Sequence, residues 1–336
     1  MTNRTRYFMA GSAAVLAIGL GTGLVAYYTG GFQAVSASPV ANELRYVPAD
    51  ASVVAYADVT AIMNSELRGR LKEAMPAHEP GQQEFERQTG IDIERDIDYV
   101  VVAVAPGSEP TSPLVVARGR FNDSLLETVA REHGGTVEQY HGKRLVSAPA
   151  GAAVASPEAG TAVQVPHGAH QVVLAFLETG LIAVGDGPAV KKAIDAQASA
   201  QSITSNNEMM ELVRDIGGTN NVWAVGRFDV LASQAKLPDQ ILSKMPAVKW
   251  FAAAGHINGG ISGSLRAEAR DDQAAEALRD VVRGVLALAR LQAQSDPRSA
   301  GLVDSLRLSG TGKTVALSFI VPAEILQMLP KAAGQQ

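Results

Sequence analysis

The longest run of apolar positions lies near the N-terminus and predicts a membrane-spanning helix. No Asp, Glu, Lys or Arg occurs between Tyr7 and Ala41, and the most hydrophobic part runs from Tyr7 to Tyr28. A helix of this length would measure about 33 Å, enough to cross the roughly 30 Å hydrocarbon core of a bilayer. We therefore expect residues 1–6 to form a cytoplasmic tail, residues 7–28 a transmembrane helix and residues 29–47 a linker.

The basic residues around this run predict its orientation in the membrane. Arg4 and Arg6 precede the run, and the next basic residue is Arg45. Because basic residues stay on the cytoplasmic side, the N-terminus is expected in the cytoplasm and the region after residue 28 outside. A cleaved signal peptide is the alternative, since Val35-Ser36-Ala37 has acceptable small-residue spacing. The apolar run is far longer than the usual h-region of about 7–15 residues, which favours a retained anchor.

Small residues recur on the predicted membrane helix and give it a candidate packing face. Gly19 and Gly23 form a GxxxG pattern, and Ala13, Ala17 and Gly21 form a second row of small residues. Such rows let two membrane helices approach closely, which predicts a homodimer through this helix. The alternative is that Gly and Ala are simply common in membrane helices. A dinucleotide-binding loop is excluded here because no strand precedes the glycines.

Apolar periodicity in the exported chain predicts short strands and helices between residues 48 and 200. A helix capped by Asn122 or Asp123 should end at Gly134-Gly135, and a helix with Pro188 in its first turn should run to about residue 198. Residues 148–169 are rich in Ala, Gly, Pro, Ser and Val and predict a mobile loop. The other expected elements are a helix over 60–75 and strands over 51–59, 99–105, 114–120, 137–140, 144–147, 171–178 and 181–184.

A similar order of elements is predicted between residues 205 and 332. A helix ending near residue 292 should place Leu278, Val282, Val285 and Leu288 or Ala289 on one face, and Pro322 should start a closing helix. The expected strands cover 221–228, 250–256, 260–267, 302–308 and 314–321. Because this order resembles that of residues 48–200, we predict an α+β protein with two related antiparallel sheet-plus-helix halves that arose by tandem duplication.

Composition excludes several classes of function. The 336 residues carry a net charge of −5, and the part after residue 41 carries −7 because only two arginines precede it. This acidic balance gives no bulk electrostatic attraction for nucleic acid. The chain has no cysteine. Disulfides, thiol catalysis, cysteine zinc sites and a lipid-modified cysteine anchor are therefore excluded.

Local motifs do not combine into a catalytic, cofactor or metal site. The segment 308–314 ends like a phosphate-binding loop, but Arg307 stands where glycine is needed and a strand is expected to follow. Acidic residues alternate with isoleucines over 91–98, which predicts a half-buried edge segment rather than a calcium loop. His167 and His170 lie in the predicted mobile loop without further ligands. We expect Trp223 and Trp250 to be core residues.

Two short segments resemble a bacterial group of envelope proteins. Tyr46-Val47-Pro48-Ala49-Asp50-Ala51 and Thr89-Gly90-Ile91-Asp92-Ile93-Glu94-Arg95-Asp96-Ile97 are similar to segments of these proteins, whose function is unknown. The group has an N-terminal membrane segment and an exported two-part α+β region. The resemblance implies a single-pass protein of the bacterial cytoplasmic membrane, and it carries over no catalytic residue.

These observations favour a binding module over an enzyme. The expected partners are the lipid bilayer around residues 7–28, a second copy through the membrane helix, and an envelope protein or apolar ligand. A hydrolase that uses carboxylates on an envelope polymer is the alternative. A cleft with two or more carboxylates, or a His–carboxylate pair, and shifted pKa values would favour the hydrolase. An aliphatic cleft would favour a lipid or peptide ligand.

Overall fold

The computed structural model describes residues 42–69, 86–87, 89–105, 113–149, 171–218, 220–230, 247–293, 301 and 303–322. The predicted membrane helix, its packing residues and the loop 148–169 (apart from residues 148 and 149) lie outside this part of the chain. No helix within the described ranges is long and apolar enough to span a bilayer. The fold is α+β, and the chain divides into two compact units.

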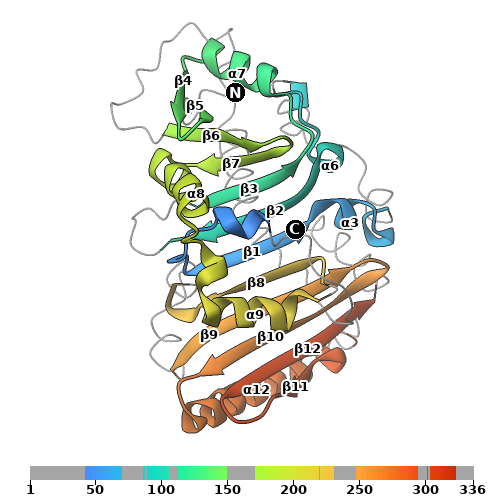
Figure 1. Ribbon diagram of the computed structural model, residues 1–336. Coiled ribbons are helices and arrows are strands. Elements are labelled where there is room, and N and C mark those ends of the chain that lie inside the picture. The colour runs from blue at the N-terminus through green and yellow to red at the C-terminus, as the bar shows by residue number, and fades with distance from the viewer. Residues whose placement is uncertain are drawn as a thin grey trace, which may run out of the picture. The chain divides into compact units, whose positions relative to one another are not determined.

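The first unit contains residues 42–51 and the described residues between 86 and 206. Six antiparallel strands follow the spatial order β2-β3-β7-β6-β5-β4. Helices α7 and α8 pack on these strands (Figure 1). The elements are η3 (Glu43–Tyr46), α6 (Ile93–Asp96), β2 (Ile97–Val104), β3 (Leu114–Gly119), α7 (Asp123–Glu132), β4 (Thr136–Tyr140), β5 (Lys143–Pro149), β6 (Gln171–Glu178), β7 (Leu181–Gly185), α8 (Gly187–Ser199) and η5 (Ile203–Ser205).

The second unit contains residues 52–69 and the described residues from 207 to 322. Its strands follow the order β1-β8-β9-β10-β12-β11, again antiparallel. Helix α9 packs on β8 and β9, whereas α12 packs on β10, β11 and β12. The elements are β1 (Val53–Asp58), α3 (Val59–Met63), α9 (Asn207–Gly217), β8 (Val222–Arg227), β9 (Val248–Ile257), β10 (Gly260–Ala269), α12 (Asp272–Ala293), β11 (Arg307–Ser309) and β12 (Thr314–Pro322).

Side-chain caps fix where several helices begin. The carboxylates of Asp58 and Asp186 and the amide oxygen of Asn122 each accept a hydrogen bond from a backbone N–H in the first turn of α3, α8 and α7, respectively. These bonds satisfy donors that a helix leaves without partners. Pro188 lies in the first turn of α8, as the sequence predicts.

Small and β-branched side chains fill the core of the second unit. Alanine and valine dominate β8 and β9, and most of these side chains are buried. Trp223 is fully buried and stacks on Tyr56 of the neighbouring strand, with 5.6 Å between ring centroids. The prediction that Trp223 is a core residue is thus confirmed.

The structure corrects four predicted elements. Residues 93–96 form the short helix α6 rather than an edge segment, because the Asp92 carboxylate caps it. Over 302–308 only residues 307 and 308 belong to a strand, and residues 303–305 are helical. The helix predicted over 60–75 is interrupted after Met63. Helix α9 was not predicted, because the sequence analysis expects no element between residue 198 and the strand over 221–228.

The first predicted strand belongs to a different unit than expected. Strand β1 pairs with β8 in the second unit, with Tyr56 opposite Trp223. The order β2-β3-β7-β6 in the first unit matches β9-β10-β12-β11 in the second, whereas β4 and β5 have no counterpart among the described residues of the second unit. Tandem duplication nevertheless stays a prediction, because a shared strand order can also arise independently.

The C-terminal part of the predicted linker 29–47 belongs to the core of the first unit. Leu44, Tyr46 and Val47 are buried, and the side chain of Glu43 is almost completely buried. Glu43 Oε1 accepts hydrogen bonds from the Tyr99 hydroxyl at 2.9 Å and from Arg118 Nε at 2.8 Å, and Arg118 Nη2 lies 2.7 Å away. Burial and the Glu43 carboxylate raise the pKa of Tyr99 to about 12. This buried ion pair anchors η3 to β2 and β3.

We expect Arg118→Met to destabilise the protein by about 3–5 kcal/mol, because it leaves the Glu43 carboxylate buried without its cation. Arg120→Met is the matched control. Arg120 pairs with Asp96 at 3.3 Å but is 67% exposed, so its loss should cost less than about 1 kcal/mol. Urea unfolding measures both changes, and equal losses would contradict the anchoring role of the buried pair.

Candidate functional site

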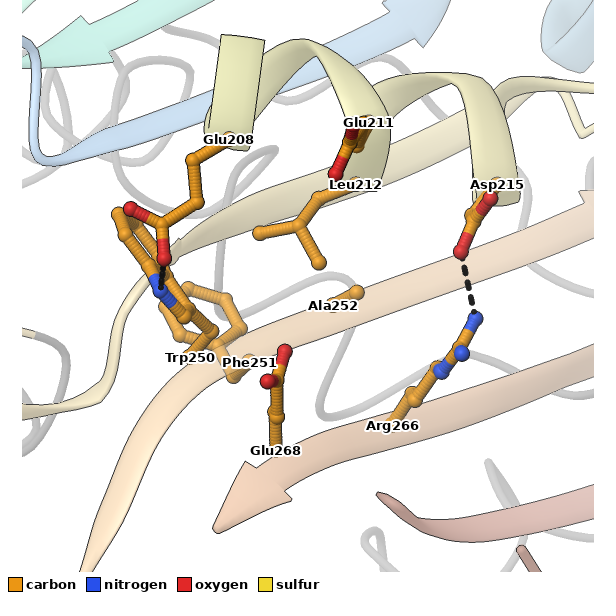
Figure 2. A pocket seen from close by; sticks show the side chains of 9 residues that line it. All are labelled: Glu208, Glu211, Leu212, Asp215, Trp250, Phe251, Ala252, Arg266 and Glu268. Carbon is orange, nitrogen blue, oxygen red and sulfur yellow. Dashed lines mark hydrogen bonds and ion pairs between the residues drawn. The ribbon is translucent and has the colours of Figure 1, made fainter. Parts of the chain in front are cut away.

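The candidate site is a pocket in the second unit between α9 and strands β9 and β10. Its volume is about 190 Å³, and Figure 2 shows the side chains around it. Carboxylates and aromatic rings dominate the lining. The lining residues are Glu208, Glu211, Leu212, Asp215, Trp250, Phe251, Ala252, Arg266 and Glu268.

The helix wall of the pocket follows from the amphipathic pattern of α9. Met209, Val213 and Ile216 are buried and fix one face of the helix against the unit. Glu208, Glu211 and Asp215 recur at intervals of three and four residues, and this spacing places them along one side of the helix. Three carboxylates therefore face the same hollow.

The sheet wall follows from antiparallel register. Trp250 lies opposite Glu268, and Ala252 lies opposite Arg266. Because side chains alternate between the two faces of a strand, these four residues share the face that α9 partly covers. Residues more than 40 positions apart in the sequence thus meet at one pocket.

Two of the four carboxylates already have cationic partners. Asp215 Oδ2 lies 3.0 Å from Arg266 Nη1, and Glu208 pairs with Lys249. Glu208 Oε1 also accepts a hydrogen bond from Trp250 Nε1 at 2.7 Å. The Lys249 hydrogen bond lowers the pKa of Glu208, with a smaller contribution from Trp250. Glu208 is therefore ionised at neutral pH and unsuited to act as a general acid.

The other two carboxylates are available to a ligand. Glu211 and Glu268 are exposed, and neither has a hydrogen-bond or ion-pair partner among the described residues. Counting Arg266 and Lys249, the pocket region has two more carboxylates than cations. Lys249 Nζ also lies 5.7 Å from the centroid of the Trp250 ring, within the range of a cation–π contact. The pocket thus suits an ammonium or guanidinium group.

The pocket does not meet the requirements of a metal centre. Metal sites need several ligand atoms that converge on one point. Within the described ranges, no group of three or more His, Asp or Glu side chains could hold a metal ion.

The structure assigns local roles to most motifs that the sequence singled out. Asp92 caps α6 and pairs with Arg95. Gly310 and Gly312 adopt positive φ angles in the turn between β11 and β12, so the segment that resembles a phosphate-binding loop is a hairpin turn. His167 and His170 lie outside the described residues. Trp250 is largely buried, as predicted, but it also lines the pocket.

Sequence reasoning missed the pocket because α9 was not predicted. The spacing of Glu208, Glu211 and Asp215 was a usable signal for one acidic helix side. Glu268 and Arg266 gave no such signal, since only the strand register brings them next to Trp250 and Ala252.

Comparison with known proteins shows limited similarity. No family model and no curated protein sequence matches the chain. Solved structures of TP0453, a membrane-associated lipoprotein of Treponema pallidum, are similar in fold. Crystal form I gives a TM-score of 0.44 at 12% identity over 89% of this chain and 99% of that one. Crystal form III gives 0.48 at 13% identity over 88% and 99%. Similarity at this level transfers no activity.

We expect Lys249→Met to raise the pKa of Glu208 toward its ordinary value, because the largest stabilising contact of the carboxylate is lost. Carbon-13 NMR of the Glu208 carboxyl measures this change. A carboxyl with a lowered pKa stabilises the fold above its ordinary pKa and loses that contribution as the pH falls. Lys313→Met removes the same charge elsewhere in the unit, so equal shifts in both variants would contradict the assignment.

Proposed function

We propose that this chain is a membrane-tethered extracytoplasmic module that binds a protein ligand in the bacterial envelope. The N-terminal apolar run supplies the tether, and the pocket of the second unit supplies the binding site. A basic side chain of the partner would enter the pocket between Glu211 and Glu268, beside Trp250. The observation that carries the proposal is that two carboxylates of the pocket have no ion-pair partner among the described residues, while two other lining residues, Glu208 and Trp250, already contact the ammonium group of Lys249.

Lys249 shows how the pocket can hold a cation. Its ammonium group pairs with Glu208 and lies over the Trp250 ring. A ligand ammonium group at Glu211 or Glu268 would gain similar charge-assisted hydrogen bonds. Because four of the nine lining side chains are carboxylates and a fifth is Arg266, an apolar ligand gains little there, and we therefore favour a protein partner over a lipid at this site.

The alternative is a hydrolase that uses carboxylates on an envelope polymer. The observation that favours this alternative is the presence of four carboxylates and two aromatic side chains around one pocket. Hydrolysis requires a protonated carboxyl group at working pH, whereas Glu208 is held ionised and Asp215 is paired with Arg266. If the wild-type chain releases soluble fragments from purified envelope and Glu268→Gln abolishes this activity, the pocket is catalytic and the binding proposal is wrong.

The tether has its own test. The full-length chain should sediment with membranes and resist extraction at high pH, because a spanning helix is not removed by breaking ionic contacts. Protease added to spheroplasts should degrade the region after residue 41. Full-length protein in the cytosolic fraction would contradict the tether without affecting the pocket.

For the pocket, we expect Glu211→Gln with Glu268→Gln to weaken binding of a lysine-rich decapeptide at least tenfold, which corresponds to about 1.4 kcal/mol. Isothermal titration calorimetry at low and moderate salt measures this loss, and binding by the wild type should itself weaken as salt rises.

The matched control is Glu132→Gln with Asp304→Asn, which removes two exposed carboxylates away from the pocket. This control should bind the peptide like the wild type, and an acetylated-lysine peptide should not bind. Equal affinity of the wild type and the pocket variant would contradict the proposed site.

A further inference from the structure

Helix α12 carries two apolar faces, and only one of them packs on its own unit. Ala275 and Leu278 belong to a core cluster with Ala269 and Val315, and Val282 packs against it. This agrees with the predicted face for Leu278 and Val282. Val285, predicted on that same face, is instead 60% exposed. Of the two alternatives for the last position, Leu288 is 64% exposed and Ala289 is half-buried.

The exposed face has the spacing of a helix-pairing seam. Ala277, Val281, Gly284, Leu288 and Leu291 follow one another at intervals of four and three residues, and all five are exposed. Intervals of four and three repeated in this way define the a and d positions of a heptad, the pattern by which one helix packs along another. Val281, Leu288 and Leu291 are 46%, 64% and 63% exposed. Their free energy of burial is therefore available to a second helix.

We propose that this seam pairs α12 with α12 of a second copy of the chain, in antiparallel orientation. A two-fold axis near residue 286 places Val281 opposite Leu291 of the second copy, and Gly284 opposite Leu288. A side-chain carbon at Gly284 would meet no atom within 4 Å, so the space above it is open to a large side chain. Leu288 thus packs into the space above Gly284 of the other copy, and Val281 packs against Leu291, as close helix packing requires.

Charge favours the same orientation. Asp280, which pairs with Arg283 of its own helix at 2.7 Å, lies near the start of the seam, and Arg290 lies near its end. Antiparallel pairing brings Arg290 of the other copy to the same end of the seam as Asp280. Parallel pairing would instead place like charges at the same level. Antiparallel helix dipoles also attract one another.

The size of the seam argues for a second copy held in the same membrane. The exposed seam side chains cover on the order of a few hundred Å² per copy, below the roughly 800 Å² per partner of a stable interface. A tether that raises the effective concentration to about the millimolar range compensates for this small area. The stability of this dimer depends on the membrane tether of the proposed function, whereas the geometry of the contact is inferred from α12 alone.

Cysteine cross-linking tests the pairing directly because the chain has no cysteine of its own. Full-length copies with Val281→Cys and copies with Leu291→Cys are co-expressed with different tags, and the membranes are oxidised. We expect a disulfide between the two tags. Adding Leu288→Glu to both copies should lower its yield at least fivefold, whereas Ser124→Glu adds the same charge to the exposed surface of α7, outside the seam, and should leave the yield unchanged.

Two results would overturn the pairing. One is a cross-link yield that Leu288→Glu does not lower, and the other is a yield no higher than that between copies carrying Ser124→Cys, a position on the exposed surface of α7 outside the seam. Because Leu288 is exposed, its replacement leaves the core intact, and an unchanged unfolding midpoint verifies this. Loss of membrane association together with retained cross-linking would refute the tether but not the seam.

Discussion

The structure of the first unit depends on burial of one ionised group, the carboxylate of Glu43. A buried charge is tolerated only where charged or polar partners replace water, and Arg118 and Tyr99 provide them. This requirement fixes the position of η3 against β2 and β3. Residues 43–47, the end of the predicted linker, are therefore part of the folded unit.

The second unit presents different chemistry on its two faces. On the α9 face, strand register brings carboxylates and Trp250 together around a polar pocket. On the α12 face, the same alternation directs small apolar residues toward the helix, and that helix keeps a second apolar stripe in solvent. One face thus favours recognition of a cationic group and the other favours contact with a helix. Both surfaces suit a protein that works by association.

The sequence predicts local elements well where their cause is local. Strand β6 has the predicted bounds of residues 171–178, because a continuous apolar run over 172–177 ends at the turn residues Thr179-Gly180. Caps such as Asn122 and Asp186 mark helix starts for the same reason. Sequence-based prediction fails where the cause of a structure lies outside the segment that is being predicted. The pairing of β1 with β8 and the meeting of Glu208 with Trp250 depend on strand order, which periodicity does not encode.

Titration of the two indole N–H signals tests the central claim of a cation-binding pocket most directly. Trp223 is buried in the core and Trp250 lines the pocket, so the two signals report on different places. Addition of a short lysine peptide should shift the Trp250 signal in a saturable, salt-sensitive manner and leave the Trp223 signal in place. An unmoved Trp250 signal at saturating peptide, or equal shifts of both signals, would contradict the account.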